Sequence, residues 1–187
     1  MTFEFRPFDK IPEVVLIEPK LFPDERGWFA ETYRKNDFVS HGVPYEFSQD
    51  NQSCSTARGT LRGLHFQKEP AAQGKLVRCI VGEIFDVAVD IRKGSPTYRK
   101  WVSTILSSNN HYMVWIPPGF AHGFLTLTST TEVAYKATSE FSQLYDRVVR
   151  WSDPTIAIKW PYDNPILSTK DMNAPLLDDV DNNFIYK

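Results

Sequence analysis

The sequence has few of the features that mark three large classes of protein. Only two of its 187 residues are cysteines, Cys54 and Cys79, and no Cys-x-x-Cys pair occurs, so neither a disulfide framework nor a thiolate zinc site is indicated. No stretch approaches the roughly 20 apolar residues of a membrane-spanning helix. Lysine and arginine number 21 against 23 acidic residues, with no basic stripe. We therefore expect neither nucleic acid nor a membrane as a partner.

Two glycine-rich phosphate-binding motifs are also absent, namely G-x-G-x-x-G and G-x-x-x-x-G-K-[S/T]. An anionic small molecule is still compatible with the net charge of −2, because a few converging arginines decide its binding. The first ten residues, MTFEFRPFDK, carry charges where a signal peptide has an apolar run. We expect a cytoplasmic protein whose length fits a single domain over residues 1–187.

Short strand-like runs dominate the sequence. They are rich in Val, Ile, Phe, Tyr and Thr, are separated by clusters of Gly, Pro, Asn or Asp, and span residues 14–22, 27–33, 59–67, 75–92, 100–107, 112–117, 122–128 and 132–138. Helical periodicity is limited to residues 34–42 and to the tail after Pro161, which we expect to be helical or irregular. The pattern predicts an all-β sandwich or jelly roll with a few short helices, rather than βαβ units.

Two histidines raise the question of a metal site. His122 ends the stretch PPGFAH, which has the spacing of the second half of a cupin metal motif, and His65 lies at the centre of the run GTLRGLHFQ. The first half of the motif does not fit, because Phe66 and Gln67 follow His65 where a second histidine and then a carboxylate are needed. We expect no functional metal, with a metal-dependent cupin oxygenase as the alternative.

Strand alternation turns three polar side chains toward the interior of a jelly roll: His65, Lys75 and Tyr135. This set suits proton abstraction next to a carbonyl, with a base near neutrality, a cation for the enolate oxygen and a phenol as proton donor. Each residue also has a plain structural interpretation, as a core histidine, a rim lysine and a core aromatic. Strict alternation points Arg62 away from His65, unless a bulge at Gly63 reorients one of them.

Eight stretches, in order along nearly the whole chain, resemble the dTDP-4-dehydrorhamnose 3,5-epimerases. They are DERGWFAE, QDNQSCS, GTLRGLHFQ, QGKLVRCIVGEIFDVAVDIRKGSPTY, WIPPGFAHGFLTL, VAYKAT, WSDPTIAIKWP and LSTKD. The resemblance implies a cupin-type jelly roll and a homodimer that exchanges N-terminal strands. It also implies catalysis without a metal or other cofactor.

The resemblance implies a catalytic role for four residues. His65 is the base that removes the C3 and C5 protons of dTDP-4-keto-6-deoxy-D-glucose to give dTDP-4-keto-L-rhamnose, and Asp171 orients the ring of His65. Tyr135 is the acid on the opposite face of the sugar, and Lys75 stabilises the enolate. Asp171 has a second interpretation from the residues alone, since Ser168-Thr169-Lys170-Asp171 has the spacing of a helix capping box.

The resemblance also implies a set of substrate-binding residues: Arg26, Phe29, Glu31, Gln49, Asn51, Arg62, His122 and Lys170. The first three are expected to reach the thymidine across the dimer, while His122 and Asp86 lie behind the catalytic set. The chain departs from the family pattern at Gln143, Leu144 and Ser152. Two alternatives therefore stay open, a single-carbon C3 or C5 epimerase and a non-catalytic sugar-nucleotide-binding cupin.

Overall fold

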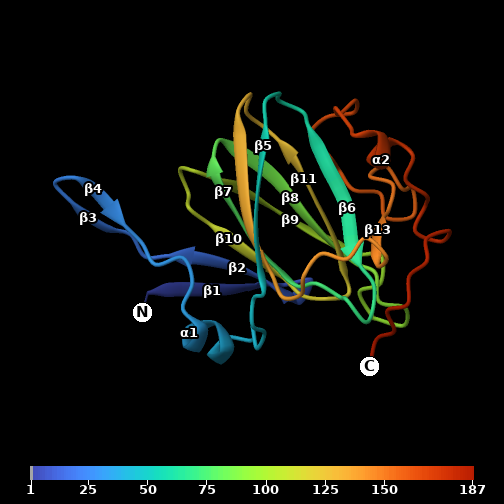
Figure 1. The fold of residues 1–187 in the computed structure, drawn as a ribbon, viewed down its shortest axis with the longest axis horizontal. Coiled ribbons are helices and arrows are strands. Elements are labelled where there is room, and N and C mark those ends of the chain that lie inside the picture. Colours follow the sequence, from blue (N-terminus) through green and yellow to red (C-terminus); the bar gives the residue numbers. More distant parts are fainter. Residues whose placement is uncertain (1) are drawn as a thin grey trace.

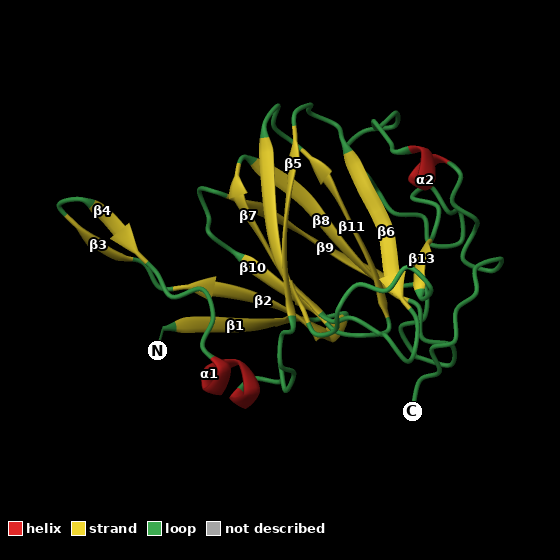
Figure 2. Cartoon of the chain, viewed as in Figure 1, coloured by secondary structure: helices red, strands yellow, loops and turns green. Residues whose placement is uncertain are grey.

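The computed structural model describes residues 2–187, which form two antiparallel β-sheets lying face to face (Figures 1 and 2). The larger sheet contains, in spatial order, β1 (Phe3–Phe8), β2 (Ile11–Pro19), β10 (Met113–Ile116), β7 (Lys75–Val81), β12 (Thr131–Ala137) and β5 (Gln49–Ser55). The smaller sheet contains β13 (Asp146–Val148), β6 (Leu61–Gln67), β11 (Phe120–Thr126), β8 (Glu83–Asp90) and β9 (Trp101–Ser107). The predicted all-β jelly-roll class is confirmed.

Four small elements, two strands and two helices, lie outside the two sheets. The strands β3 (Phe22–Asp24) and β4 (Gly27–Phe29) form a hairpin that projects away from the sandwich, at the left of Figure 1. The helices α1 (Lys35–Ser40) and α2 (Thr169–Met172) fall within the two segments where helix was predicted. Among residues 2–187, no helix is long and apolar enough to cross a membrane.

The predicted run 75–92 is two strands rather than one, and Gly82 separates them. Gly82 has a φ of +79°, which L side chains rarely adopt, and a Cβ at this position would lie 2.2 Å from Thr128 Oγ1. A tight turn therefore replaces continuous strand at this point. β1 and β5 were not among the predicted strands, and both lie at the edges of the larger sheet.

Apolar side chains fill the space between the sheets and cover the outer face of each. The central cluster includes Val77 and Val114 from the larger sheet and Ile84 and Phe124 from the smaller. Residues of the C-terminal segment, such as Leu177, pack on the outer face of the smaller sheet. Phe38 of α1 belongs to the corresponding cluster on the larger sheet.

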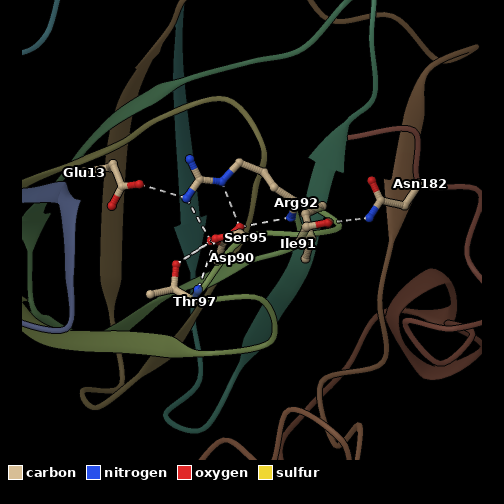
Figure 3. A network of polar contacts seen from close by, with 7 residues as sticks. All are labelled: Glu13, Asp90, Ile91, Arg92, Ser95, Thr97 and Asn182. Carbon is tan, nitrogen blue, oxygen red and sulfur yellow. Dashed lines mark hydrogen bonds and ion pairs between the residues drawn. The ribbon is translucent and has the colours of Figure 1, made fainter. Parts of the chain in front are cut away.

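A buried ionic network fixes the end of β8 (Figure 3). The carboxylate of Asp90, which is fully buried, accepts hydrogen bonds from Arg92 Nε at 2.9 Å, Ser95 Oγ at 2.5 Å and Thr97 Oγ1 at 2.6 Å. Arg92 Nη2 also donates to Glu13 Oε1 at 3.0 Å, which links the network to β2. Burial alone would raise the pKa of Asp90, but these hydrogen bonds outweigh it and hold the pKa below its ordinary value.

Candidate active site

A cavity of about 340 Å³ lies between the two sheets, and α2 contributes Asp171 to its lining. The smaller sheet contributes β6 and β11 to its wall, and the larger sheet contributes β5, β7 and β12. Six of the predicted site residues line it: Arg62, His65, Lys75, His122, Tyr135 and Asp171. Residues separated by more than 100 positions in the sequence therefore share one cavity.

A β-bulge in β6 brings Arg62 and His65 to the same wall. His65 pairs with His122 of β11, but Arg62 pairs with Phe124, so two residues of β6 oppose the single residue Gly123. The backbones are close at this point, because a Cβ on Gly63 would lie 2.5 Å from Gly123 Cα. The bulge considered from the sequence is therefore present, and it turns the Arg62 side chain into the cavity.

His65 forms a close pair with a carboxylate from the far end of the chain. His65 Nε2 lies 2.5 Å from Asp171 Oδ1, and the Asp171 side chain is 3% exposed. Burial acts against ionisation of Asp171, but hydrogen bonds from His65 and Ser168 outweigh it and lower the pKa of Asp171. An ionised carboxylate only accepts hydrogen bonds, so Nε2 of His65 carries the hydrogen and Nδ1 carries the lone pair. This assigns Nδ1 as the basic atom of the ring.

The second cavity histidine has its own carboxylate. His122 Nε2 lies 2.8 Å from Asp86 Oδ2, and the two side chains are 7% and 1% exposed. Asp86 is therefore a buried partner of His122 and not part of a solvated strand face. His65 and His122 each pair with a different aspartate, and residues 2–187 contain no group of three His, Cys, Asp or Glu side chains arranged to hold a metal ion.

Lys75 brings a positive group to the cavity wall from β7. Its side chain lines the cavity together with His65 and Tyr135. Burial lowers the pKa of Lys75 to about 8, although the charges of Asp146 and Asp86 act in the opposite direction. Lys75 is therefore a half-buried group at the cavity wall whose charge changes near pH 8.

Tyr135 and Arg62 complete the polar lining. Burial raises the pKa of the Tyr135 phenol, against the effect of the nearby Arg62 charge. Arg62 is held from β5, because its Nε donates to Ser55 Oγ at 3.2 Å and its Nη2 donates to the Cys54 carbonyl at 3.0 Å. The phenol is thus kept protonated, and the guanidinium is fixed in place.

Three further predicted residues lie outside this wall. Gln49 Nε2 donates to Asn51 Oδ1 at 2.7 Å, and Asn51 lines a separate cavity of about 320 Å³. Lys170 on α2 forms an ion pair with Asp146 of β13. The structure therefore does not bring these three side chains to His65.

The other three predicted residues lie on or next to the projecting hairpin. Arg26 is bound to Asp24 at 2.5 Å, Phe29 is 64% exposed, and Glu31 pairs with Arg34 at 2.6 Å. Within one chain, Arg26, Phe29 and Glu31 are therefore not brought to the cavity that contains His65.

The polar residues at the site that were not predicted as functional include Ser168 and Asp146. Ser168 lines the cavity and binds Asp171, and Asp146 adds a negative charge that acts on both Lys75 and Tyr135. The capping-box spacing gave a signal for Ser168, because the motif pairs its first and fourth residues. Asp146 lies in the stretch that departs from the family pattern, and no motif marks it.

Comparison with known proteins agrees with this geometry. A family model described as dTDP-4-dehydrorhamnose 3,5-epimerase matches residues 9–179. The dTDP-4-dehydrorhamnose 3,5-epimerase of Shigella flexneri is 53% identical over 173 residues, which is 92% of this chain and 95% of that protein.

Solved structures show the same relationship. A dTDP-6-deoxy-D-glucose-3,5-epimerase from Legionella pneumophila, in complex with dTDP-4-keto-L-rhamnose, matches with a TM-score of 0.94, 42% identity and coverage of 99% of both chains. A 3'-monoepimerase from Streptomyces bikiniensis, in complex with dTDP-quinovose, matches with a TM-score of 0.85 and 32% identity. The match covers 92% of this chain and 87% of that chain. The family match spans nearly the whole sequence and includes every residue that lines the cavity. This chain belongs to the dTDP-4-dehydrorhamnose 3,5-epimerase family.

Proposed function

We propose that this isomerase inverts C3 and C5 of dTDP-4-keto-6-deoxy-D-glucose and so forms dTDP-4-keto-L-rhamnose. The observation that carries the proposal is the convergence of His65, Lys75 and Tyr135 on one cavity between the sheets. Proton abstraction beside a ketone needs a base, a group that stabilises the enolate oxygen and an acid. The cavity provides one residue of each kind.

Each inversion follows from this arrangement in two proton transfers. The C–H bond next to the keto group breaks, its proton passes to His65 Nδ1, and its electron pair forms the enolate. The charge on the C4 oxygen is stabilised by the Lys75 ammonium group. Tyr135 then protonates the same carbon from the opposite face, which inverts its configuration, and exchange with water restores both side chains.

Neither proton transfer nor charge stabilisation alone accounts for the rate enhancement of an enzyme. General base catalysis contributes about 10²–10⁴-fold, and one enolate-stabilising group about 10²–10³-fold. The rest of the rate enhancement has to come from binding of the nucleotide, which holds the sugar in position. Arg62 is suited to bind the diphosphate, because its planar guanidinium donates two parallel hydrogen bonds.

Incubation of the chain with dTDP-4-keto-6-deoxy-D-glucose in D₂O, followed by NMR, tests the proposal. We expect deuterium at both C3 and C5 and an L-configured product, with turnover that persists in EDTA. Label at one carbon only would establish a single-carbon epimerase. Binding of dTDP without any exchange would establish a sugar-nucleotide-binding protein, and loss of turnover in EDTA would indicate a metal-dependent enzyme.

We also propose that the chain works as a homodimer in which the β3–β4 hairpin reaches the partner's cavity. The hairpin projects from the sandwich and exposes Trp28 and Phe29 by 55% and 64%, which favours burial against another surface. Residues 1–187 then act as one jelly-roll domain with an exchanged N-terminal region. A cytoplasmic location is part of this proposal, and the exposed free thiol of Cys54 supports it.

Mixing two inactive variants tests the dimer. Arg26→Ala would impair binding from the hairpin, and His65→Ala would remove the base. If the hairpin crosses to the partner, one site of each hybrid dimer retains both side chains, and about a quarter of the wild-type turnover returns after subunits exchange. Sedimentation of the chain as a monomer, or no recovery in a mixture that forms hybrids, would refute the crossing.

A further inference from the structure

Ser168 makes two hydrogen bonds to the aspartate that pairs with His65. Its hydroxyl donates to Asp171 Oδ2 at 2.9 Å and accepts from the Asp171 backbone N–H at 3.1 Å. The other carboxylate oxygen, Oδ1, lies 2.5 Å from His65 Nε2. The three side chains therefore form a continuous series from Ser168 through Asp171 to His65.

The backbone bond alone identifies Ser168 as the N-cap of α2. Ser168 has extended backbone angles, with φ −71° and ψ 160°, and the helix that follows contains only Thr169–Met172. A cap needs an acceptor for the free N–H groups of the first turn, and the serine oxygen supplies it. It does not need a donor, so the bond from Ser168 Oγ to Asp171 Oδ2 is additional to capping.

The hydrogen bond that Ser168 Oγ donates restricts rotation of the Asp171 carboxylate. Asp171 is 2% exposed, so neither oxygen is freely solvated. With Oδ2 held by Ser168, rotation of the carboxylate about its Cβ–Cγ bond would break one bond on each side. Without Ser168, only the bond to His65 would oppose this rotation.

We propose that Ser168 is a positioning residue for the reaction, and that its hydroxyl holds the Asp171 carboxylate in the plane that directs Oδ1 at His65. This inference rests on the proposed function, because it assigns His65 as the base. Ser168 acts through Asp171 and has no part in proton transfer to the sugar.

The test compares two substitutions that separate the hydroxyl from the cap. Ser168→Gly removes the hydroxyl, and glycine is nearly as good an N-cap as serine, whereas Ser168→Thr keeps both. Thr155→Ala is the matched control, because Thr155 Oγ1 donates at 2.7 Å to Asp153, another buried carboxylate that lies outside the cavity. All three variants are compared with wild type in the assay of the proposed reaction.

We expect Ser168→Gly to lower kcat by about tenfold or more with a change in KM of less than about twofold, since one bond to a charged group is lost. Ser168→Thr should restore most of the lost turnover, and Thr155→Ala should keep the wild-type rate. A rise in KM at unchanged kcat would show that Ser168 binds substrate instead, and an unchanged rate in Ser168→Gly would also overturn the proposal.

A second measurement does not depend on turnover. The chain has four histidines, so the ring signals of His65 can be assigned in NMR spectra by comparison with a His65→Asn variant. A carboxylate that rotates away no longer fixes the hydrogen of the neutral ring on Nε2, and the ring ¹⁵N signals should show a larger fraction of the Nδ1–H form in Ser168→Gly. The other groups of the cavity wall, Arg62, Lys75, His122, Tyr135 and Asp171, are the same in both proteins.

The two measurements separate the two proposals. If wild type shows no exchange in D₂O but the hydrogen of the His65 ring moves from Nε2 toward Nδ1 in Ser168→Gly, the proposed function fails and the positioning of the carboxylate stands. If wild type is active and the His65 ring keeps its hydrogen on Nε2 in Ser168→Gly, the positioning role fails and the proposed function stands.

Discussion

His65 and Asp171 lie 106 residues apart in the sequence, and their side chains meet at 2.5 Å. The pairing joins β6, which lies between β13 and β11 in the smaller sheet, to a short helix that follows the last strand. It orients the ring so that Nδ1, and not Nε2, carries the lone pair.

Replacement of Asp171 by asparagine tests this orientation. The side-chain amide introduced by Asp171→Asn could donate a hydrogen bond to Nε2, which would place the hydrogen of the neutral ring on Nδ1 and remove its basic lone pair. We therefore expect this substitution to reduce kcat by about 10²–10⁴-fold, the range of general base catalysis, with binding of dTDP unchanged. Turnover within about threefold of wild type would show that the pair does not set the tautomer.

Tyr135→Phe separates removal of the proton from its return. If His65 takes the proton and Tyr135 supplies one on the opposite face, the variant keeps the first step and loses the second. We expect deuterium from D₂O to enter the recovered, uninverted substrate while inverted product falls by about 10²-fold or more. NMR of both sugars measures this. Loss of exchange and of product in equal proportion would assign the first proton transfer to Tyr135 as well.

The pKa of Lys75 predicts the pH above which the reaction slows. The protonated amine stabilises the enolate, and burial lowers the pKa of Lys75 to about 8, so kcat/KM should fall as pH rises through about 8. The phenol does not titrate in this range, because burial raises the pKa of Tyr135 above its ordinary value.

Lys75→Arg is the variant that checks this assignment. Arginine stays charged at all accessible pH values, so the decline near pH 8 should disappear even where the maximal rate is lower. A decline that persists unchanged in Lys75→Arg would assign it to another group.

The Asp90 network predicts how stability depends on acid. The pKa of Asp90 is lowered in the folded chain, so its contribution is complete above the unfolded pKa of about 3.9 and is lost as pH falls through the lower folded value. Asp90→Asn should cost about 3 kcal/mol at pH 7, because it leaves Arg92 without its buried partner. The loss should shrink as pH falls below about 4 in thermal or denaturant unfolding.

Asp50→Asn is the matched control for this measurement. Asp50 pairs with Lys136 at 2.9 Å, but its side chain is 72% exposed, and surface pairs contribute only about 0–1 kcal/mol. Equal effects of the two substitutions at pH 7 would show that the Asp90 network does not stabilise the fold.

Much of the sandwich was predictable, because a strand with one apolar face has a clear two-residue period. β5 was missed for the opposite reason. Its residues Gln49, Asn51 and Ser53 are the less exposed half of the strand, and Ser53 lines the polar cavity, so neither face of β5 is apolar. A strand that contributes to a polar site therefore lacks the pattern that reveals other strands.

The site was predictable in part. Alternation brought His65, Lys75 and Tyr135 to the interior, and Gly63 indicated the bulge that admits Arg62. The contact with Asp171 was not accessible to local patterns, because Ser168 and Asp171 also form a capping motif whose spacing is entirely local. Only the family resemblance connected Asp171 to His65.

The bulge in β6 makes the number of residues between Arg62 and His65 as important as their identity. An extra residue beside Gly123 in β11 would restore regular pairing with β6, and strict alternation would then send the Arg62 guanidinium to the opposite side of the sheet, although every functional group was retained. When relatives are aligned, a gap in this segment therefore marks a site whose side chains are arranged differently. Percentage identity alone would not reveal this difference.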